Sequence, residues 1–227
     1  VDLFEKEEQM KQIESAQYIK GLHNLISAHF DLRNMVKLKE TICILESFSE
    51  TPIVVNNQNN LIQSFVYLYI AKINQHFLEG SFSEGLLMVP TMEQKLKEIE
   101  LYMDSHRVLV FYYKIACIYF GNEKYNESLF YLEKIINNKN LTMREDLMCF
   151  ARLLYLILHY ELGNDYYLEN QLKSTYKFML KMNDLHEVQK EIIRFLKNLN
   201  SIYPGDIKKE FIKMKERFVE LEKNTYE

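Results

Sequence analysis

The stretch Tyr112–Ile135 decides the fold of this chain. It reads Tyr112-x2-Ile115-Ala116-x2-Tyr119, then a turn, then Tyr125-x2-Ser128-x3-Leu132-x2-Ile135. Large side chains recur every three or four positions, which is the spacing of one face of an α-helix. A small residue, Ala116 or Ser128, stands in each segment where two helix backbones would come closest. The pattern predicts two short antiparallel helices that need neighbours to cover their apolar faces.

Helical periodicity continues over nearly the whole chain. With only 6 Gly and 3 Pro in 227 residues, a turn-rich β fold is disfavoured. We expect helices at residues 3–28, 31–49, 59–79, 83–103, 105–121, 124–138, 142–163, 166–182, 184–202 and 205–224. Thr142 and Asp184 each precede a glutamate by three residues, which is the capping-box pattern of a helix start. Pro90 should kink or split its helix, and residues 49–60 should form the longest irregular loop.

Three glycine-containing turns indicate an internal repeat. They contain Gly80, Gly121 and Gly163, and they recur at spacings of about 40 residues. Stacked helix pairs of such a period form an α-α superhelix, or solenoid. The sequence therefore predicts an all-α fold of about five antiparallel helix pairs in a single domain over residues 1–227. Because the chain opens at Val1 rather than Met, we expect it to be a fragment of a longer protein.

The opening stretch resembles one tetratricopeptide repeat. The matching positions are Tyr112, Ile115, Ala116, Tyr119, Tyr125, Ser128 and Leu132. The family's turn glycine is replaced by Glu123 and its terminal proline by Asn140. Residues 144–181, with Phe150-Ala151-Arg152 and Leu158-His159-Tyr160-Glu161-Leu162-Gly163, resemble the C-terminal part of uncharacterised bacterial tetratricopeptide-like (TPR-like) proteins. This resemblance implies a cytoplasmic binding scaffold without catalytic residues or a cofactor.

Composition and motifs argue against several other functions. The net charge is −4, whereas a general nucleic-acid binder needs a cationic surface. No apolar run approaches the roughly 20 residues that span a membrane. His186-Glu187 lacks the second histidine of a zinc-protease motif, and we expect no metal site and no enzyme. Cys43, Cys117 and Cys149 lie in apolar helical contexts and should be buried, reduced thiols.

The candidate binding residues follow from the repeat register. In this architecture the first helix of each pair lines the concave face. The register places there Ile70, Asn74 and Phe77, then Tyr113, Cys117 and Phe120, then Leu153, Ile157 and Tyr160. A face this apolar should hold a partner segment or be filled by another part of the chain itself. Arg152 interrupts it, and could pair with Glu145 or Glu161 or fix a partner's carboxylate.

The leading functional hypothesis is a scaffold that binds a peptide or a protein segment in an apolar concave groove. The alternative is a domain of a bacterial regulator that senses a peptide or a small molecule. Binding of RNA by helical repeats would require a basic inner face, but the expected inner positions are mostly apolar. The sequence leaves open the partner's identity and the oligomeric state.

Overall fold

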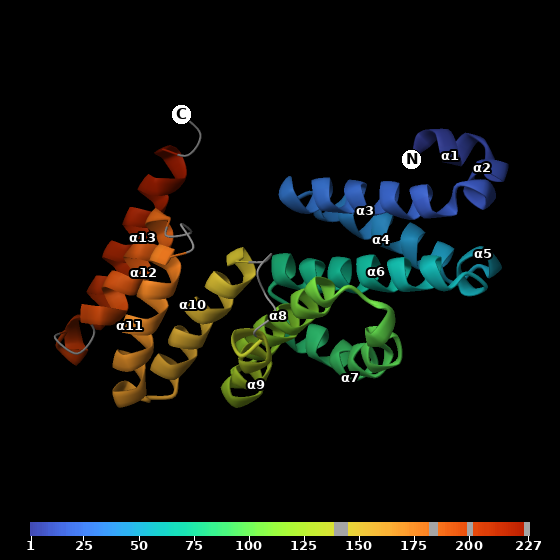
Figure 1. Ribbon diagram of the computed structural model, residues 1–227. Helices are drawn as coiled ribbons and strands as arrows, with labels where there is room; N and C mark the ends of the chain where they lie inside the picture. Colours follow the sequence, from blue (N-terminus) through green and yellow to red (C-terminus); the bar gives the residue numbers. More distant parts are fainter. Residues whose placement is uncertain (139–144, 182–185, 199–201, 225–227) are drawn as a thin grey trace. The chain divides into compact units, whose positions relative to one another are not determined.

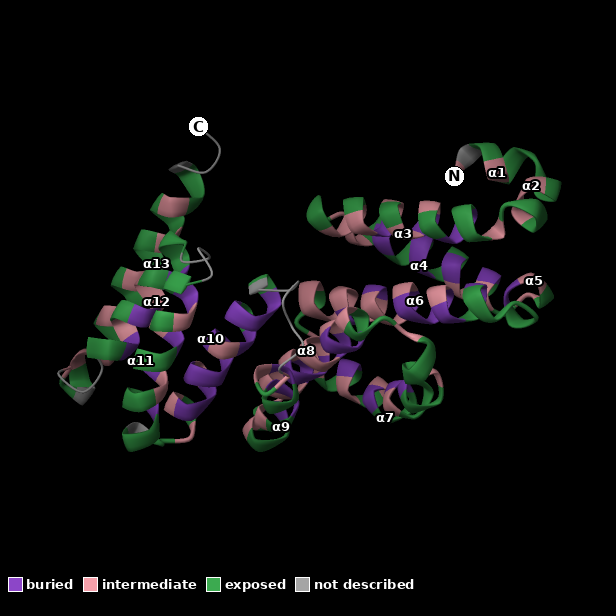
Figure 2. Cartoon of the chain, viewed as in Figure 1, coloured by how far each residue is buried: buried purple, intermediate pink, exposed green. Residues whose placement is uncertain are grey.

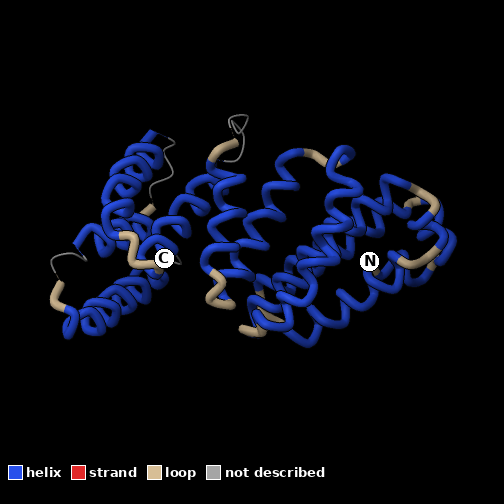
Figure 3. The backbone as a smooth tube through the Cα atoms, turned by 90° about the horizontal axis from the view of Figure 1, so that it is seen from below, coloured by secondary structure: helices blue, strands red, loops and turns tan. Residues whose placement is uncertain are grey.

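The computed structural model describes residues 1–138, 145–181, 186–198 and 202–224. These residues form helices joined by short loops, with no strand among them (Figure 1, Figure 3). The predicted all-α class is therefore confirmed. The chain divides into two compact units, residues Val1–Lys124 and Tyr125–Glu227, which are called the first and second unit below. The superhelix and the single domain stay predictions.

The first unit is organised around one long helix. Its elements are α1 (Asp2–Lys6), α2 (Glu8–Ile13), α3 (Ser15–Asp31), α4 (Met35–Ser49), α5 (Pro52–Val55), α6 (Gln58–Glu79), α7 (Phe82–Ile99), the 3-10 helix η1 (Glu100–Tyr102) and α8 (Ser105–Gly121). Helix α6 contacts α3, α4, α5, α7 and α8. Every residue from Ile62 to Leu78 is buried or half-buried (Figure 2). Its position explains why its apolar residues extend around most of the helix.

The core of the first unit combines aliphatic layers with aromatic pairs. Leu22, Leu45 and Leu68, from α3, α4 and α6, belong to one buried cluster. The rings of Phe65 on α6 and Phe111 on α8 stack with centroids 5.4 Å apart. Burial of such side chains stabilises the fold by roughly 1.5–3 kcal/mol each.

The second unit repeats the same kind of helix-on-helix packing. Its elements are α9 (Tyr125–Ile136), α10 (Glu145–Glu161), α11 (Asp165–Lys181), α12 (Glu187–Asn198), the 3-10 helix η3 (Pro204–Asp206) and α13 (Ile207–Asn224). Helix α10 packs against both α9 and α11, and α12 packs against α11 and α13. Leu156, Leu172 and Ile193, from α10, α11 and α12, belong to its buried cluster.

The turns that follow α3, α6, α8 and α10 share one backbone geometry. The left-handed residues are Arg33 (φ 52°), Gly80 (φ 66°), Glu123 (φ 59°) and Gly163 (φ 68°). In each turn the next residue donates its N–H to a carbonyl five positions earlier. These bonds run from Asn34 to His29, Ser81 to His76, Lys124 to Tyr119 and Asn164 to His159, at 2.8–3.1 Å. This hydrogen bond is the Schellman closure of a helix C-terminus.

Several sequence-based expectations need correction. Residues 3–28 are not one helix, because breaks at Glu7 and Glu14 separate α1, α2 and α3. Residues 49–60 contain α5 and the start of α6 rather than a long loop. Helix α7 runs through Pro90 without being split. Pro90 is exposed, so water can satisfy the carbonyl that loses its donor. The capping patterns at Thr142 and Asp184 lie outside the described residues.

Candidate functional site

The predicted inner-face residues of the first unit lie on two helices in contact with each other. Ile70, Asn74 and Phe77 are on α6, and Tyr113, Cys117 and Phe120 are on α8. All six are half-buried. Their spacing of three or four residues keeps each set on one side of its helix.

Lys114 joins the two sets, and the sequence did not identify it as a site residue. Its Nζ donates a hydrogen bond of 2.6 Å to Asn74 Oδ1 and lies 5.0 Å from the centroid of the Phe77 ring. Burial lowers the pKa of Lys114, although the neighbouring Cys117 acts in the opposite direction. Within the described part of the chain, Lys114 forms no ion pair. Its charge is therefore supported by an amide oxygen and an aromatic face.

Tyr113 and Cys117 form a second polar contact on α8. Their side chains are hydrogen-bonded one helical turn apart. Burial raises the pKa of the Cys117 thiol to about 11, and it outweighs the opposing effects of Lys114 and Tyr113. The thiol is therefore protonated at neutral pH and is a weak nucleophile. This contact adds polarity to the face without supplying a reactive group.

A stacked pair of rings joins α6 to α3. His23 on α3 is parallel to Tyr67 on α6, with an interplanar angle of 6° and centroids 3.8 Å apart. Burial lowers the pKa of His23, and the nearby Arg107 lowers it further. Tyr67 and Arg107 each stand two helical turns before Asn74 and Lys114, respectively. That heptad spacing is the sequence signal that could have revealed Lys114 and Arg107 as members of this face.

In the second unit, Arg152 on α10 lies against an aromatic ring. Its Cζ is 4.4 Å from the centroid of Phe178 on α11. Burial lowers the pKa of Arg152, and its Nε is buried without a hydrogen-bond partner among the described residues. No ion pair between Arg152 and Glu161 is present among the described residues, and the side chain of Glu145, the other expected partner, lies outside them.

The other predicted residues of α10 differ in accessibility. Ile157 and Tyr160 are half-buried, and Tyr160 packs against the core cluster of the second unit. Leu153 is only 7% exposed and belongs to that cluster. Leu153 therefore contributes to the core of this unit in the structure described here.

The cysteines and histidines supply no further chemical centre. Cys149 is buried and Cys117 half-buried, but Cys43 is exposed, which corrects the expectation of three buried thiols. Among the described residues, no group of three or more His, Cys, Asp or Glu side chains is arranged to hold a metal ion. Within the same residues, no helix combines the length and the apolar composition needed to cross a lipid bilayer.

Comparison of the sequence with protein-family models reveals no match, and comparison with curated proteins reveals no significant similarity. The features that bear on function are therefore the α6–α8 face in the first unit and α10 in the second.

Proposed function

We propose that this chain is a protein-interaction module that binds partner segments carrying apolar and acidic side chains. The observation that best supports this proposal is the environment of Lys114. An ammonium group is held at a half-buried position by Asn74 and the Phe77 ring, with no carboxylate partner in the described residues.

A carboxylate from a partner would improve this environment. Partial burial disfavours the charged form of Lys114 and lowers its pKa. A partner carboxylate placed beside the ammonium would favour the charged form and raise that pKa again. The folded protein has already ordered Lys114 and removed it partly from water. Binding a partner therefore requires less additional free energy for ordering and desolvating this side chain. The site is thus better prepared for an acidic group than an exposed lysine would be.

The second unit offers the same combination with a guanidinium. Arg152 is positioned by Phe178, and its planar fork can bind a carboxylate through two parallel hydrogen bonds. Ile157 and Tyr160 lie on the same helix and remain partly accessible. Each unit therefore provides a cation beside apolar surface, which suits an amphipathic segment with acidic residues next to apolar ones.

Selection from a random peptide library displayed on phage tests this proposal. The wild-type chain should enrich peptides in which Asp or Glu lies within one helical turn of a large apolar residue. Lys114→Gln keeps a polar side chain able to donate to Asn74 but removes the charge. Arg152→Gln does the same in the second unit. Each variant should weaken binding of the enriched peptides by about 1–3 kcal/mol, as measured by fluorescence anisotropy.

Lys177→Gln is the matched control, because Lys177 is an exposed lysine on α11. It removes the same charge and should leave peptide affinity unchanged. Enrichment of basic peptides would contradict the proposal. Equal losses of affinity in the control and in both site variants would show that binding responds only to overall charge.

A further inference from the structure

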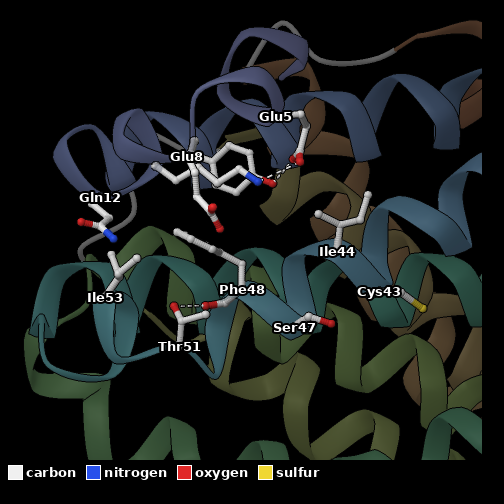
Figure 4. Close-up of a pocket in the computed structure, with 11 residues that line it drawn as sticks. Glu5, Glu8, Gln12, Cys43, Ile44, Ser47, Phe48, Thr51 and Ile53 are labelled. Carbon is white, nitrogen blue, oxygen red and sulfur yellow. Dashed lines mark hydrogen bonds and ion pairs between the residues drawn. The ribbon is translucent and has the colours of Figure 1, made fainter.

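The first unit contains a pocket away from Lys114, between its N-terminal helices and α4. Its volume is about 470 Å³, and residues of α1, α2, α3, α4 and α5 line it (Figure 4). Small-molecule sites in proteins commonly enclose roughly 300–1,000 Å³. The pocket is therefore large enough for a ligand of several tens of atoms.

One wall of the pocket is a self-contained polar cluster. The Lys11 ammonium lies 2.8 Å from Glu5 Oε2, and the Tyr18 hydroxyl donates to the other oxygen of Glu5. The hydrogen bonds from Lys11 and Tyr18 hold the pKa of Glu5 below its ordinary value. Lys11 also lies over the Tyr18 ring, 5.2 Å from its centroid. The positive charge of the pocket is therefore already neutralised by Glu5.

Once Lys11 and Glu5 are paired, Glu8 is the remaining charged residue in the lining. Within the described residues its carboxylate takes part in no ion pair and no side-chain hydrogen bond. Figure 4 shows this carboxylate extending from α2 toward the Phe48 ring, into the space between the helices. The pocket thus presents one uncompensated negative charge beside an aromatic side chain.

Over the pocket as a whole, more of the lining surface is apolar than polar. Phe48 meets the Tyr18 ring edge-to-face with centroids 4.8 Å apart, so the ring is held in place. Ile44 and Ile53 add aliphatic surface to the lining. The Thr51 hydroxyl is occupied by a 2.7 Å hydrogen bond to the Phe48 carbonyl. A ligand here would need an apolar body for these walls and a cationic group for Glu8.

We propose that this pocket binds a small organic cation with an apolar body, such as an aryl-alkyl amine. The ammonium would pair with the Glu8 carboxylate, while the body would pack against Phe48 and Ile44. An anionic ligand is disfavoured for two reasons. The Lys11 ammonium is already paired with Glu5, and the Glu8 carboxylate would repel a second negative charge. This site lies on different helices from Lys114 and does not depend on the function proposed above.

Isothermal titration calorimetry on the full chain tests this assignment with three compounds of similar shape. Phenethylamine carries the cation, phenethyl alcohol is neutral, and phenylpropanoate is an anion. Phenethylamine should bind about tenfold more tightly than phenethyl alcohol, because a charged hydrogen bond to Glu8 contributes that much. Phenylpropanoate should bind more weakly than either.

Two variants assign the binding to this pocket. Glu8→Gln removes the charge with little change in size and should weaken phenethylamine about tenfold. Glu7 and Glu8 are both exposed, but Glu7 does not line the pocket. Glu7→Gln therefore removes an equivalent charge outside the pocket and should change affinity less than about twofold. Ser47→Phe, at an exposed lining position, should abolish binding by filling the space.

The assignment is overturned if phenethyl alcohol binds as tightly as phenethylamine, or if Glu7→Gln weakens binding as much as Glu8→Gln. It is equally overturned if phenethylamine produces no binding heat up to roughly 10 mM with protein whose circular dichroism is that of the folded chain.

Discussion

At the scale of single residues, the most costly backbone conformation belongs to two non-glycine residues. Arg33 and Glu123 have φ of 52° and 59°. A side chain in this left-handed region meets the following carbonyl, at a cost of about 1–2 kcal/mol. In the tetratricopeptide pattern that Tyr112–Ile135 resembles, a glycine would stand where this chain has Glu123. The structure thus places a left-handed backbone at a position where the residue type disfavours it.

Replacing Glu123 with glycine should therefore stabilise the protein. We expect Glu123→Gly to raise the free energy of unfolding by about 1 kcal/mol, measured by thermal melting, because the strain of the left-handed conformation is removed. Glu127→Gly makes the same chemical change at an exposed position inside α9 and should instead destabilise by about 0.5–1 kcal/mol. A lower melting temperature for both variants would argue against strain at Glu123.

Gly121 is required for a different reason. A Cβ added at Gly121 would lie 2.3 Å from Cδ1 of the Phe82 ring, so the glycine allows the end of α8 to approach α7 closely. We expect Gly121→Ala to lower the free energy of unfolding by about 1–3 kcal/mol through overpacking. Gly205→Ala is the control, since nothing lies within 4 Å of its Cβ position. Equal melting temperatures for the two variants would contradict this packing role.

At the scale of elements, three helices carry a histidine near their C-terminal ends, namely α3, α6 and α10. His29, His76 and His159 supply the carbonyls that accept the turn hydrogen bonds after α3, α6 and α10. Two of the side chains also contact the turn directly. His76 Nδ1 lies 2.8 Å from Ser81 Oγ, and His159 Nδ1 lies 3.2 Å from Asn164 Nδ2. These histidines therefore connect each helix end to the turn that follows it.

Mild acid should weaken the protein through His159. Its ring lies among Tyr155 and Tyr167 on α10 and α11, with centroids 4.4 and 4.5 Å away. Burial lowers the pKa of His159 below its ordinary value, so the unfolded chain binds its proton first. Stability is then greatest above about pH 6.5 and falls as the pH decreases through the folded value.

Melting temperatures measured between about pH 7.5 and about pH 5.5 test this expectation. The wild type should lose stability toward the acid end, and His159→Phe should reduce that loss. His186→Phe is the control at an exposed histidine and should keep the wild-type slope. His23, whose pKa burial also lowers, contributes in the same direction, so His159→Phe should reduce the slope without abolishing it.

At the scale of the whole molecule, different groups of packed helices should unfold with different free energies. The buried cluster of α3, α4 and α6 shares no residue with the cluster of α10, α11 and α12. The two clusters belong to separate compact units, and cooperative units of one protein can open with different free energies. We therefore expect the chain to open in parts rather than in one step.

Leu156→Ala tests this expectation, because Leu156 is fully buried on α10. It should cost about 2–5 kcal/mol locally and reduce hydrogen-exchange protection in α10, α11 and α12. Protection in α3 and α4 should remain near the wild-type level. An equal loss of protection in all these helices would show that the chain unfolds as one cooperative unit.

The sequence predicted helices better than it predicted contacts. The bounds of α8 agree with the predicted 105–121, and Ala116 and Ser128 are both fully buried, as expected of small residues at close packing positions. Apolar periodicity and glycine turns are local signals, and they identify such features directly. The breaks that separate α1 from α3 escaped prediction, because periodicity runs across Glu7 and Glu14 without a Gly or Pro.

The candidate site was harder to predict, because its polar members depend on contacts between helices. Lys114 is a charge within an apolar run, and only the packing of α8 against α6 places it beside Asn74 and Phe77. Leu153 fits the repeat register but faces the core of its unit. Residue type and spacing predict which residues share one side of a helix. The packing of neighbouring helices determines whether that side is buried or exposed.

The shared turn geometry has a consequence for how such a chain could grow or shrink. The junctions after α3, α6, α8 and α10 close with the same hydrogen bond around a left-handed residue. A tandem duplication or deletion of about 40 residues, with both breakpoints in such turns, would rejoin ends of matching backbone geometry. Recombination at these points would therefore change the number of helix pairs while preserving every junction.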